Sequence, residues 1–353
     1  MTTSVPKLNF ASALFLGQYH PSRELRPWEE FTTGAPVAVR EVPEARTLAS
    51  SVATQQRAES GLVARSALHG LMDVMEALPQ PGDLVLVDQG AYPLAQWACS
   101  VAMMRGVRLE TFPHHQPPAS LPPGRTWFVT DGWCQGCGLP APLARMQALA
   151  LETGGRVIVD DSLAFGLLGR RTSGAAFGDG TGTVRWSGLD HAGFVWLASL
   201  AKAYGTPITV ITGDHTTITR VARRGSNRLH SSPPSAADLG AGLSALVRNA
   251  QFGELRGRLY RLTQWLRRAF TDLGYPPQGL PFPIVGTRIS SSLLARRWWR
   301  ELANDGVQVL VQLPRCHPIP VLSAVVRADH RQADLDRLVR ALAAATRIRS
   351  AAR

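Results

Sequence analysis

The chain has 353 residues, of which 45% are hydrophobic and 18% are charged. This composition excludes a disordered chain, and the length allows a large core domain with a smaller one beside it. The formal net charge is +12, carried almost entirely by arginine, since Lys7 and Lys202 are the only lysines. The arginine excess is explained by genome composition, or by an anionic partner such as a phosphate-bearing cofactor, a coenzyme A nucleotide or an acidic carrier protein. The arginines are scattered, so the sequence does not favour nucleic acid as a partner.

The cysteines are too few for a disulfide framework in a chain of this length: Cys99, Cys134, Cys137 and Cys316. Cys134 and Cys137 have the CxxC spacing of a zinc or redox site. No further ligands follow at comparable spacing, so no metal site is predicted. A redox pair formed by these two cysteines is the less favoured alternative. His114 and His115 follow a predicted strand and are expected on a surface loop. No apolar run approaches the ~18 residues of a membrane span and no signal cleavage site is evident, so a cytoplasmic protein is expected.

Predicted strands and helices alternate through the first two thirds of the chain. Apolar runs predict strands over residues 61–65, 83–88, 107–112, 126–130, 156–160, 194–198 and 208–212. Apolar residues at helical spacing predict helices over residues 67–78, 91–104 and 143–152. Continuous apolar strands separated by helices predict a mostly parallel sheet that is covered on both faces. Ligands of such sheets bind beyond the carboxyl ends of the strands.

The pattern changes after residue 235. Residues 235–273 are mostly helical and rich in arginine, and residues 276–283 form a Pro/Gly linker. Residues 284–353 then predict a small α+β domain, with strands at 284–289, 307–312 and 321–327 and helices at 291–304 and from residue 332. We therefore expect an N-terminal segment (1–45), a large domain (46–235), a connecting helix with a linker (236–283) and a small C-terminal domain (284–353).

Lys202 is the first candidate for chemistry. It follows an apolar strand directly, in a chain that otherwise uses arginine. A lysine in this setting can be desolvated, which lowers its pKa and frees its amine for Schiff-base formation, whereas a guanidinium cannot form an imine.

Asp160 is the second candidate. It ends the apolar run 157–160, where a buried carboxylate needs a cationic or hydrogen-bonding partner. A protonated pyridine nitrogen is such a partner. Asp160 ends one predicted strand and Lys202 follows the next. The two residues together are a more specific signal than either residue alone.

The order of motifs along almost the whole chain resembles the α-oxoamine synthase group of pyridoxal-phosphate (PLP) enzymes, which includes aminolevulinate synthase, serine palmitoyltransferase and oxononanoate synthase. The segments that carry the resemblance are 8–17, 82–88, 129–132 with 141–143, 159–169, 199–205 and 231–234. The resemblance implies the α/β fold of fold type I PLP-dependent transferases, also called the aminotransferase class I/II fold. That fold has a large domain with a mostly parallel seven-stranded sheet and a small C-terminal α+β domain. It also implies a homodimer with its sites at the subunit interface.

Carried over by position, the resemblance implies a role for each candidate. Lys202 carries the cofactor as a Schiff base and moves protons, and Asp160 holds the pyridine nitrogen. Tyr92 stands where the family has a histidine stacked on the ring, and an aromatic side chain there still stacks. The other implied cofactor contacts are the phosphate-binding helix start at Ser66, Ala67 and Leu68, the hydroxyl of Ser199, the loop residues Asp131 and Gln135, and Ser231 or Ser232 reaching the neighbouring subunit's phosphate.

The chain also departs from the family pattern. Leu163 replaces a histidine near the cofactor, and Gln135 replaces a serine. The arginine that grips the substrate carboxylate falls on Ser323, which cannot form a bidentate pair with a carboxylate. Either the amino substrate lacks a free α-carboxylate, or Arg327 or Arg315 binds it instead.

Three functions are compatible with these features. The first is a PLP-dependent acyltransferase that condenses a small amine or amino acid with acyl-CoA or an acyl carrier protein, in a specialised biosynthetic pathway. The second is a PLP-dependent aminotransferase, decarboxylase or lyase. The third is a non-catalytic binding or scaffold subunit with the same fold, against which the retained Lys202 argues.

Overall fold

The computed structural model describes residues 8–20, 32–171 and 174–347. They form two compact units, which are described separately. Unit 1 comprises Met1–Gly17, Cys134–Leu139 and Gly253–Arg353, and unit 2 comprises Gln18–Trp133 and Pro140–Phe252. Residues 1–7 and 21–31 of the expected N-terminal segment lie outside the described residues, as do residues 348–353 of the expected small domain.

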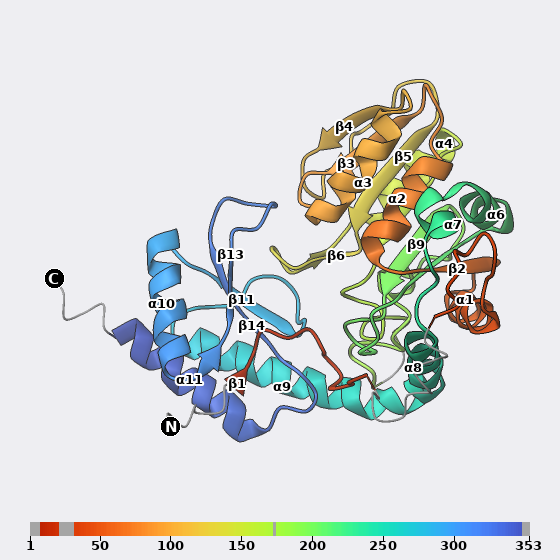
Figure 1. The fold of residues 1–353 in the computed structure, drawn as a ribbon. Helices are drawn as coiled ribbons and strands as arrows, with labels where there is room; N and C mark the ends of the chain where they lie inside the picture. Colours follow the sequence, from red (N-terminus) through yellow and green to blue (C-terminus); the bar gives the residue numbers. More distant parts are fainter. Residues whose placement is uncertain (1–7, 21–31, 172–173, 348–353) are drawn as a thin grey trace. The chain divides into compact units, whose positions relative to one another are not determined.

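Unit 2 is built on a seven-stranded sheet with the order β2-β10-β9-β8-β5-β3-β4 (Figure 1). Its strands are β2 (Ser60–Ala64), β3 (Leu84–Asp88), β4 (Arg108–Phe112), β5 (Thr126–Asp131), β8 (Val157–Asp160), β9 (Phe194–Ser199) and β10 (Thr209–Gly213). Strand β10 runs antiparallel to both of its neighbours, and the other four pairings are parallel. The predicted mostly parallel seven-stranded sheet is confirmed.

The helices of unit 2 begin where the sequence supplies start signals. Ser66 and Asp214 cap α2 and α6 by accepting hydrogen bonds from the backbone N–H groups of His69 and Thr217. Pro93 occupies the first turn of α3, which therefore begins two residues later than predicted. The helices are α1 (Pro43–Gln56), α2 (Ala67–Ala77), α3 (Pro93–Met103), α4 (Leu143–Glu152), α5 (Thr183–Trp186), α6 (His215–Arg224), α7 (Ser226–His230), α8 (Ala236–Val247) and the 3-10 turn η3 (Arg248–Gln251).

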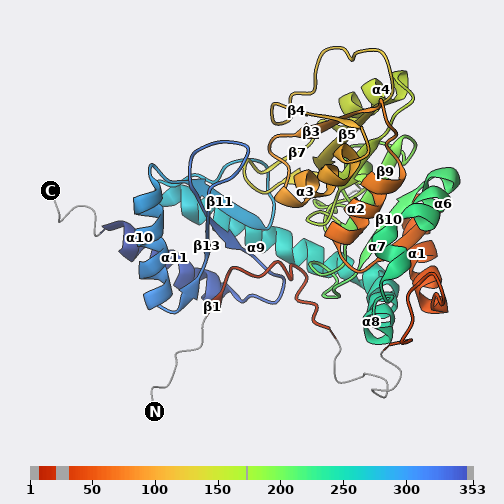
Figure 2. The same cartoon turned by 45° about the horizontal axis from the view of Figure 1, so that its top comes forward.

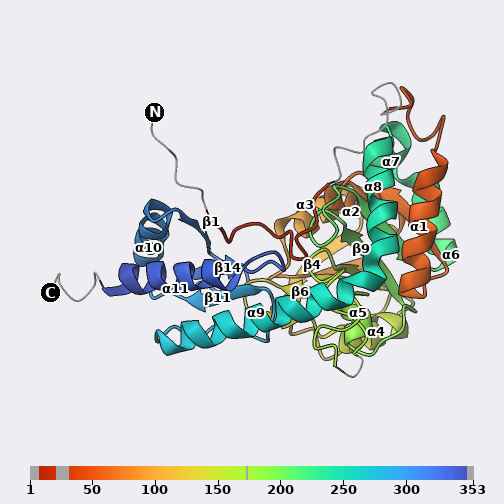
Figure 3. The same cartoon turned by 90° about the horizontal axis from the view of Figure 1, so that it is seen from below.

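Helices cover both faces of this sheet. On one face, α2, α3 and α6 pack over alternate strand residues such as Val129, Ile158 and Leu197, in one buried apolar cluster. Helix α4 contacts β5 and β8 and lies on the opposite face from α2 and α3 (Figure 3). Because side chains alternate along a strand, every second residue of β5, β8 and β9 faces α2 and α3, and we call this the α2/α3 face.

Unit 1 contains a three-stranded sheet with the order β11-β14-β13 and a parallel pair β1-β12. Its elements are β1 (Leu8–Asn9), α9 (Phe252–Asp272), β11 (Ile284–Arg288), α10 (Ser292–Asn304), β12 (Val307–Gln308), β13 (Leu310–Gln312), β14 (Val321–Val325) and α11 (Gln332–Arg347). Figure 2 shows α10 and α11 side by side, in agreement with their contact. The ribbon of β6 (Trp133–Cys134) and β7 (Leu139–Pro140) carries a turn that belongs to unit 1.

Two expectations for this part of the chain need correction. The single strand predicted over 307–312 is split at Val309, because β12 pairs with β1 whereas β13 pairs with β14. The long helical stretch 235–273 is likewise divided into α8, η3 and α9. Periodicity within one segment does not reveal which partner each half of the segment pairs with.

Within the described residues, none of the helices combines the length and the apolar character needed to cross a lipid bilayer.

Candidate functional site

Three polar residues end neighbouring parallel strands of unit 2. Asp131 closes β5, Asp160 closes β8 and Ser199 closes β9. Asp131 and Asp160 are direct partners in the register, and Asp160 is the partner of Leu197, two residues before Ser199. Strand alternation directs all three side chains to the α2/α3 face. The carboxyl edge of the sheet therefore gathers two carboxylates and a hydroxyl on one face.

Asp160 and Asp161 have different surroundings although they are adjacent. Asp161 is fully enclosed and accepts hydrogen bonds from Thr183 and from the Trp196 indole, at 2.7 to 2.9 Å. Burial raises the pKa of Asp161 to about 6, against the effect of those hydrogen bonds, and the nearby Asp160 carboxylate raises it further. Asp160 is half-buried, and its Oδ1 accepts from the Ser162 N–H at 2.9 Å. Asp160 is thus the carboxylate that a ligand at the strand edge can reach.

Lys202 lies on the loop that joins β9 to β10. The loop is closed by hydrogen bonds from Leu200 N to Ile208 O at 2.8 Å and from Thr206 N to Leu200 O at 3.1 Å. The Ser199 hydroxyl accepts from Ala201 N at 3.2 Å, just before the lysine. The lysine side chain is half-buried. Its backbone is therefore held from both sides, directly beyond the strand edge that carries Asp160.

The residues after Lys202 anchor the loop in the protein. Ala203 and Tyr204 are buried, and the Tyr204 ring packs against Phe165 with centroids 4.9 Å apart. Gly205 has φ +68°, and a Cβ there would lie 2.5 Å from the Gln18 carbonyl oxygen. Only glycine combines this backbone conformation with such a close approach.

The start of α2 offers a site for an anion. The first N–H groups of an α-helix have no partner within the helix, and the helix dipole favours negative charge there. Ser66 satisfies the N–H of His69, and its hydroxyl also lies 2.8 Å from His69 Nδ1. The N–H groups of Ala67 and Leu68 open the same first turn. Strand β2, which precedes this turn, runs in the direction of β9, so both strands end at the same sheet edge.

Ser231 and Ser232 lie near this helix start within the same chain. They line a small pocket together with Arg65 and His69. Arg65 donates to the Ser232 carbonyl at 3.4 Å. The predicted reach of these serines to a neighbouring subunit stays a prediction.

Tyr92 and Asp131 are linked through the backbone. The Tyr92 N–H donates to Asp131 Oδ2 at 2.8 Å, and the phenol ring is half exposed. Asp131 thereby fixes the backbone of Tyr92, which is the N-cap residue of α3.

The remaining predicted residues belong to unit 1. Ser323 is fully buried in the central strand β14, and its hydroxyl accepts from the Gln312 side chain at 3.3 Å. Arg327 forms a two-point ion pair with Asp329, at 2.9 and 3.2 Å. Gln135 lies in the turn between β6 and β7. Neither Ser323 nor Arg327 therefore presents an unengaged group to a carboxylate.

Sequence reasoning missed a contact between a buried carboxylate and a histidine. Asp88, at the end of β3, is fully buried, and its Oδ1 lies 2.8 Å from His114 Nδ1. The His114 ring is partly buried and stacks on His115, with centroids 3.7 Å apart. His114 lies on a loop as expected, but its ring is mostly enclosed by the protein. Its burial depends on Gly90, where a Cβ would lie 2.1 Å from the His114 ring.

Comparison with known proteins identifies relatives that are similar to this chain in sequence. No family model matches the chain. A putative 8-amino-7-oxononanoate synthase from Thermosynechococcus vestitus is 29% identical, over 96% of this chain and 88% of that protein. An 8-amino-7-oxononanoate synthase from Halorhodospira halophila is 28% identical, over 86% of this chain and 75% of that protein.

Solved structures agree in fold. A serine palmitoyltransferase from S. paucimobilis, solved with PLP and myriocin bound, aligns with a TM-score of 0.85 over 99% of this chain and 92% of that chain, at 16% identity. An 8-amino-7-oxononanoate synthase from Francisella tularensis aligns with a TM-score of 0.79 over 98% of this chain and 99% of that chain, at 14% identity. The predicted fold and the predicted resemblance to this group of proteins are confirmed.

Proposed function

We propose that this chain, a divergent relative of the α-oxoamine synthases, is a PLP-dependent transferase that condenses an amino compound with an acyl thioester. One observation carries the proposal. Lys202 is held on a fixed loop directly beyond β9, while Asp160 ends the adjacent strand β8 with its side chain on the α2/α3 face. The relatives in sequence are named as synthases of 8-amino-7-oxononanoate, and a structural neighbour contains PLP.

The groups at the strand edge fit PLP by their chemistry. The cofactor has an aldehyde, a basic ring nitrogen, a phosphate and an aromatic face. The chain offers an amine at Lys202, a carboxylate at Asp160, helix-start N–H groups at Ala67 and Leu68 and an exposed ring at Tyr92. Each of these groups suits one part of the cofactor.

PLP, when bound, supplies an electron sink that stabilises negative charge at the carbon next to the amine. The residues of the chain supply the remaining functions. Asp160, whose Oδ1 is occupied by Ser162, would keep a proton on the ring nitrogen through Oδ2. The Lys202 amine would accept the proton from the carbon of the amino compound and return it later. The start of α2 would fix the phosphate, which orients the ring against these groups.

The substrates remain part of the proposal. Ser323 is buried and Arg327 is paired with Asp329, which supports an amino compound that does not rely on the usual arginine for its carboxylate. The net charge of +12 suits an anionic acyl donor, either acyl-CoA or an acyl carrier protein. A homodimer is part of the same proposal. So is a cytoplasmic location, where free cysteines stay reduced.

The test separates condensation from the other PLP reactions. The purified chain is loaded with PLP and given an amino compound and an acyl-CoA, and the release of free coenzyme A thiol is recorded. We expect thiol release that requires the amine and that is lost in Lys202→Ala but not in Lys7→Ala, which changes the other lysine. Turnover that requires an oxo-acid amino acceptor and leaves the thioester intact would contradict condensation.

A further inference from the structure

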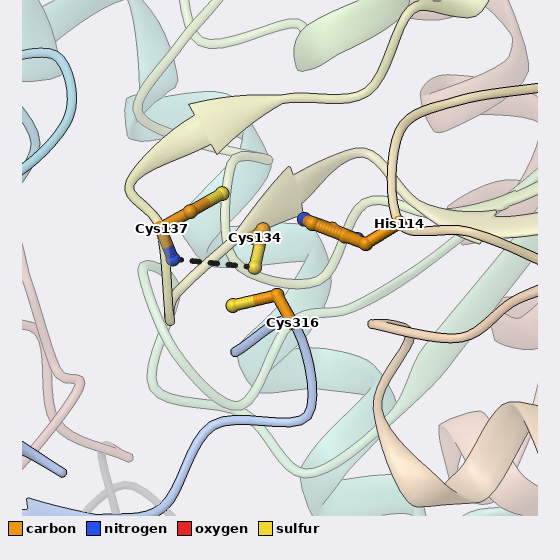
Figure 4. A group of neighbouring side chains, drawn as sticks. All are labelled: His114, Cys134, Cys137 and Cys316. Atoms are coloured by element: carbon orange, nitrogen blue, oxygen red, sulfur yellow. Dashed lines mark hydrogen bonds between the residues drawn. The ribbon is translucent and has the colours of Figure 1, made fainter. Parts of the chain in front are cut away.

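Unit 1 brings three cysteines together from two distant segments of the chain. Cys134 and Cys137 lie in the ribbon of β6 and β7, and Cys316 lies between β13 and β14. Their sulfur atoms lie within 4.8 Å of one another. Figure 4 draws these side chains, together with His114 of unit 2. We propose that Cys134, Cys137 and Cys316 form a binding site for a thiolate-preferring metal ion, most suitably Zn²⁺.

The separation of the sulfur atoms suits this ion. A Zn–S distance of about 2.3 Å places the sulfur atoms of a tetrahedral site roughly 3.8 Å apart. The cysteines are within 4.8 Å before any ion draws them inward, so a shift of side chains alone closes the site. Soft thiolate ligands select zinc and related ions over magnesium or calcium.

The turn has the local features that hold two thiolates on one ion. The Cys137 N–H points at Cys134 Sγ at 3.5 Å, shown as the dashed line in Figure 4. The Gly138 N–H donates to the Cys134 carbonyl at 2.9 Å, and Gly138 adopts φ +70°. The backbone thus curls around the first sulfur atom, and its N–H donor would stabilise the negative charge of a metal-bound thiolate.

The second segment is built to approach this turn. A Cβ on Gly136 would lie 2.6 Å from Cys316 Sγ and 2.5 Å from Pro314 Cβ. Any side chain at position 136 would therefore separate Cys316 from the other two cysteines. The Gly136 carbonyl also accepts a hydrogen bond from the Gln278 side chain, and Leu280 N donates to the Gly138 carbonyl at 2.9 Å.

Charge repulsion among three neighbouring thiolates favours the binding of a cation between them. Three thiolates this close together repel one another unless a cation lies between them. A divalent ion provides that charge and binds the thiolate forms.

The experiment uses the full chain, freed of metal with a chelator under reducing conditions and then titrated with Co²⁺ and Zn²⁺. We expect one equivalent of Co²⁺ to produce the intense thiolate-to-cobalt absorption and one equivalent of Zn²⁺ to remove it. Cys316→Ser should weaken Co²⁺ binding by more than about 100-fold, because a lost ligand costs more than a lost supporting contact. Cys99→Ser is the matched control, since Cys99 is a buried free cysteine in α3 and should bind as the wild type does.

A second pair of variants keeps all ligands and tests the geometry. Gly136→Ala should weaken Co²⁺ binding, because its methyl group pushes Cys316 away. Gly240→Ala should not, because nothing lies within 4 Å of a Cβ there. Absence of stoichiometric thiolate-to-cobalt absorption in the folded wild type would overturn the proposal. So would equal affinity in Cys316→Ser, or fewer than four titratable thiols in the protein that is isolated without reductant and then unfolded in the presence of a chelator. The readout is independent of PLP, so it stands apart from the proposed enzyme activity.

Discussion

Asp161 shows how one residue in the site region sets a pH dependence of stability. Burial is the main reason why its pKa rises from 3.8 to about 6 in the folded chain. A raised carboxyl pKa gives stability that is complete below about pH 3.8 and is lost as the pH rises through about 6. A rise of this size corresponds to about 3 kcal/mol.

We predict that Asp161→Asn removes this loss of folding stability with rising pH. The free energy of unfolding of the variant, relative to that of the wild type, should rise by about 2 kcal/mol between pH 4 and pH 6. Urea titrations at several pH values measure this difference, with Asp190→Asn as the control because its side chain is exposed. A difference between variant and wild type that stays constant with pH would contradict the assignment.

His191 acts in the opposite direction. Burial, followed by the charge of Arg185, lowers its pKa from 6.5 to about 4, and its Nε2 lies 2.9 Å from the Thr212 hydroxyl. A lowered histidine pKa gives stability that is present above about pH 6.5 and is lost as the pH falls towards 4.

His191→Gln should therefore change the pH profile in the sense opposite to Asp161→Asn. The two groups oppose each other, so His191→Gln should lose stability relative to the wild type as the pH rises from 4 to 6. The same urea titrations provide the measurement. A His191→Gln profile with the wild-type slope would show that the imidazole is not held neutral.

At the level of elements, the start of α2 is the feature that most directly links fold to function. Ser66 caps this helix, and Ser235 caps α8 in the same way, by accepting from the Asp238 N–H at 3.1 Å. Removing either cap costs about 1 kcal/mol of stability. Of these two helices, α2 is the one that directly follows a strand ending at the sheet edge where Asp160 and Lys202 lie.

We predict that Ser66→Ala and Ser235→Ala destabilise the chain to a similar extent but differ in cofactor affinity. Ser66→Ala should weaken PLP binding severalfold, because the helix start that would hold the phosphate loses its hydroxyl and its order. Ser235→Ala should leave the affinity unchanged. Fluorescence titration with PLP and thermal unfolding together provide the comparison, and equal PLP affinities would argue against a phosphate at α2.

The sequence predicted those elements whose signals are local. Residues 143–152 match α4, and the strands ending at Asp88 and Asp160 were expected at those residues. Pairing between distant segments was not visible in the sequence. Periodicity could not show that Val309 separates β12 from β13, nor that Cys316 joins the CxxC turn. Both depend on contacts between residues far apart in the chain, whereas a spacing rule covers only near neighbours.

The candidate site was predictable to the extent that it follows from topology. Parallel strands share their carboxyl edge, so Asp160 and the Lys202 loop could be expected together. Asp160 was predicted from its place at the end of an apolar run, and its role from the resemblance. The structure adds that Asp161 is enclosed by Thr183 and Trp196. The burial of His114 against Asp88 had no sequence signal, because it depends on the close approach to Gly90.

For the whole molecule, the proposed homodimer is the property to test. Ser231 and Ser232 line a pocket with Arg65 near the start of α2 in their own chain. A dimer is expected from the resemblance, with these serines near a subunit interface. Sedimentation velocity at micromolar concentration should give the mass of a dimer, about twice the 38.2 kDa of the chain. A monomer with full activity would contradict a site shared between subunits.

The central claim is that Lys202 binds PLP covalently, and the absorption spectrum of the purified chain with added PLP tests it most directly. The wild type and Lys7→Ala should show a near-visible band that differs from free PLP and that resists dialysis. Lys202→Ala should lack this band while its far-ultraviolet circular dichroism stays that of a folded chain. A band of equal intensity in Lys202→Ala, or no band in any of the three proteins, would contradict the account.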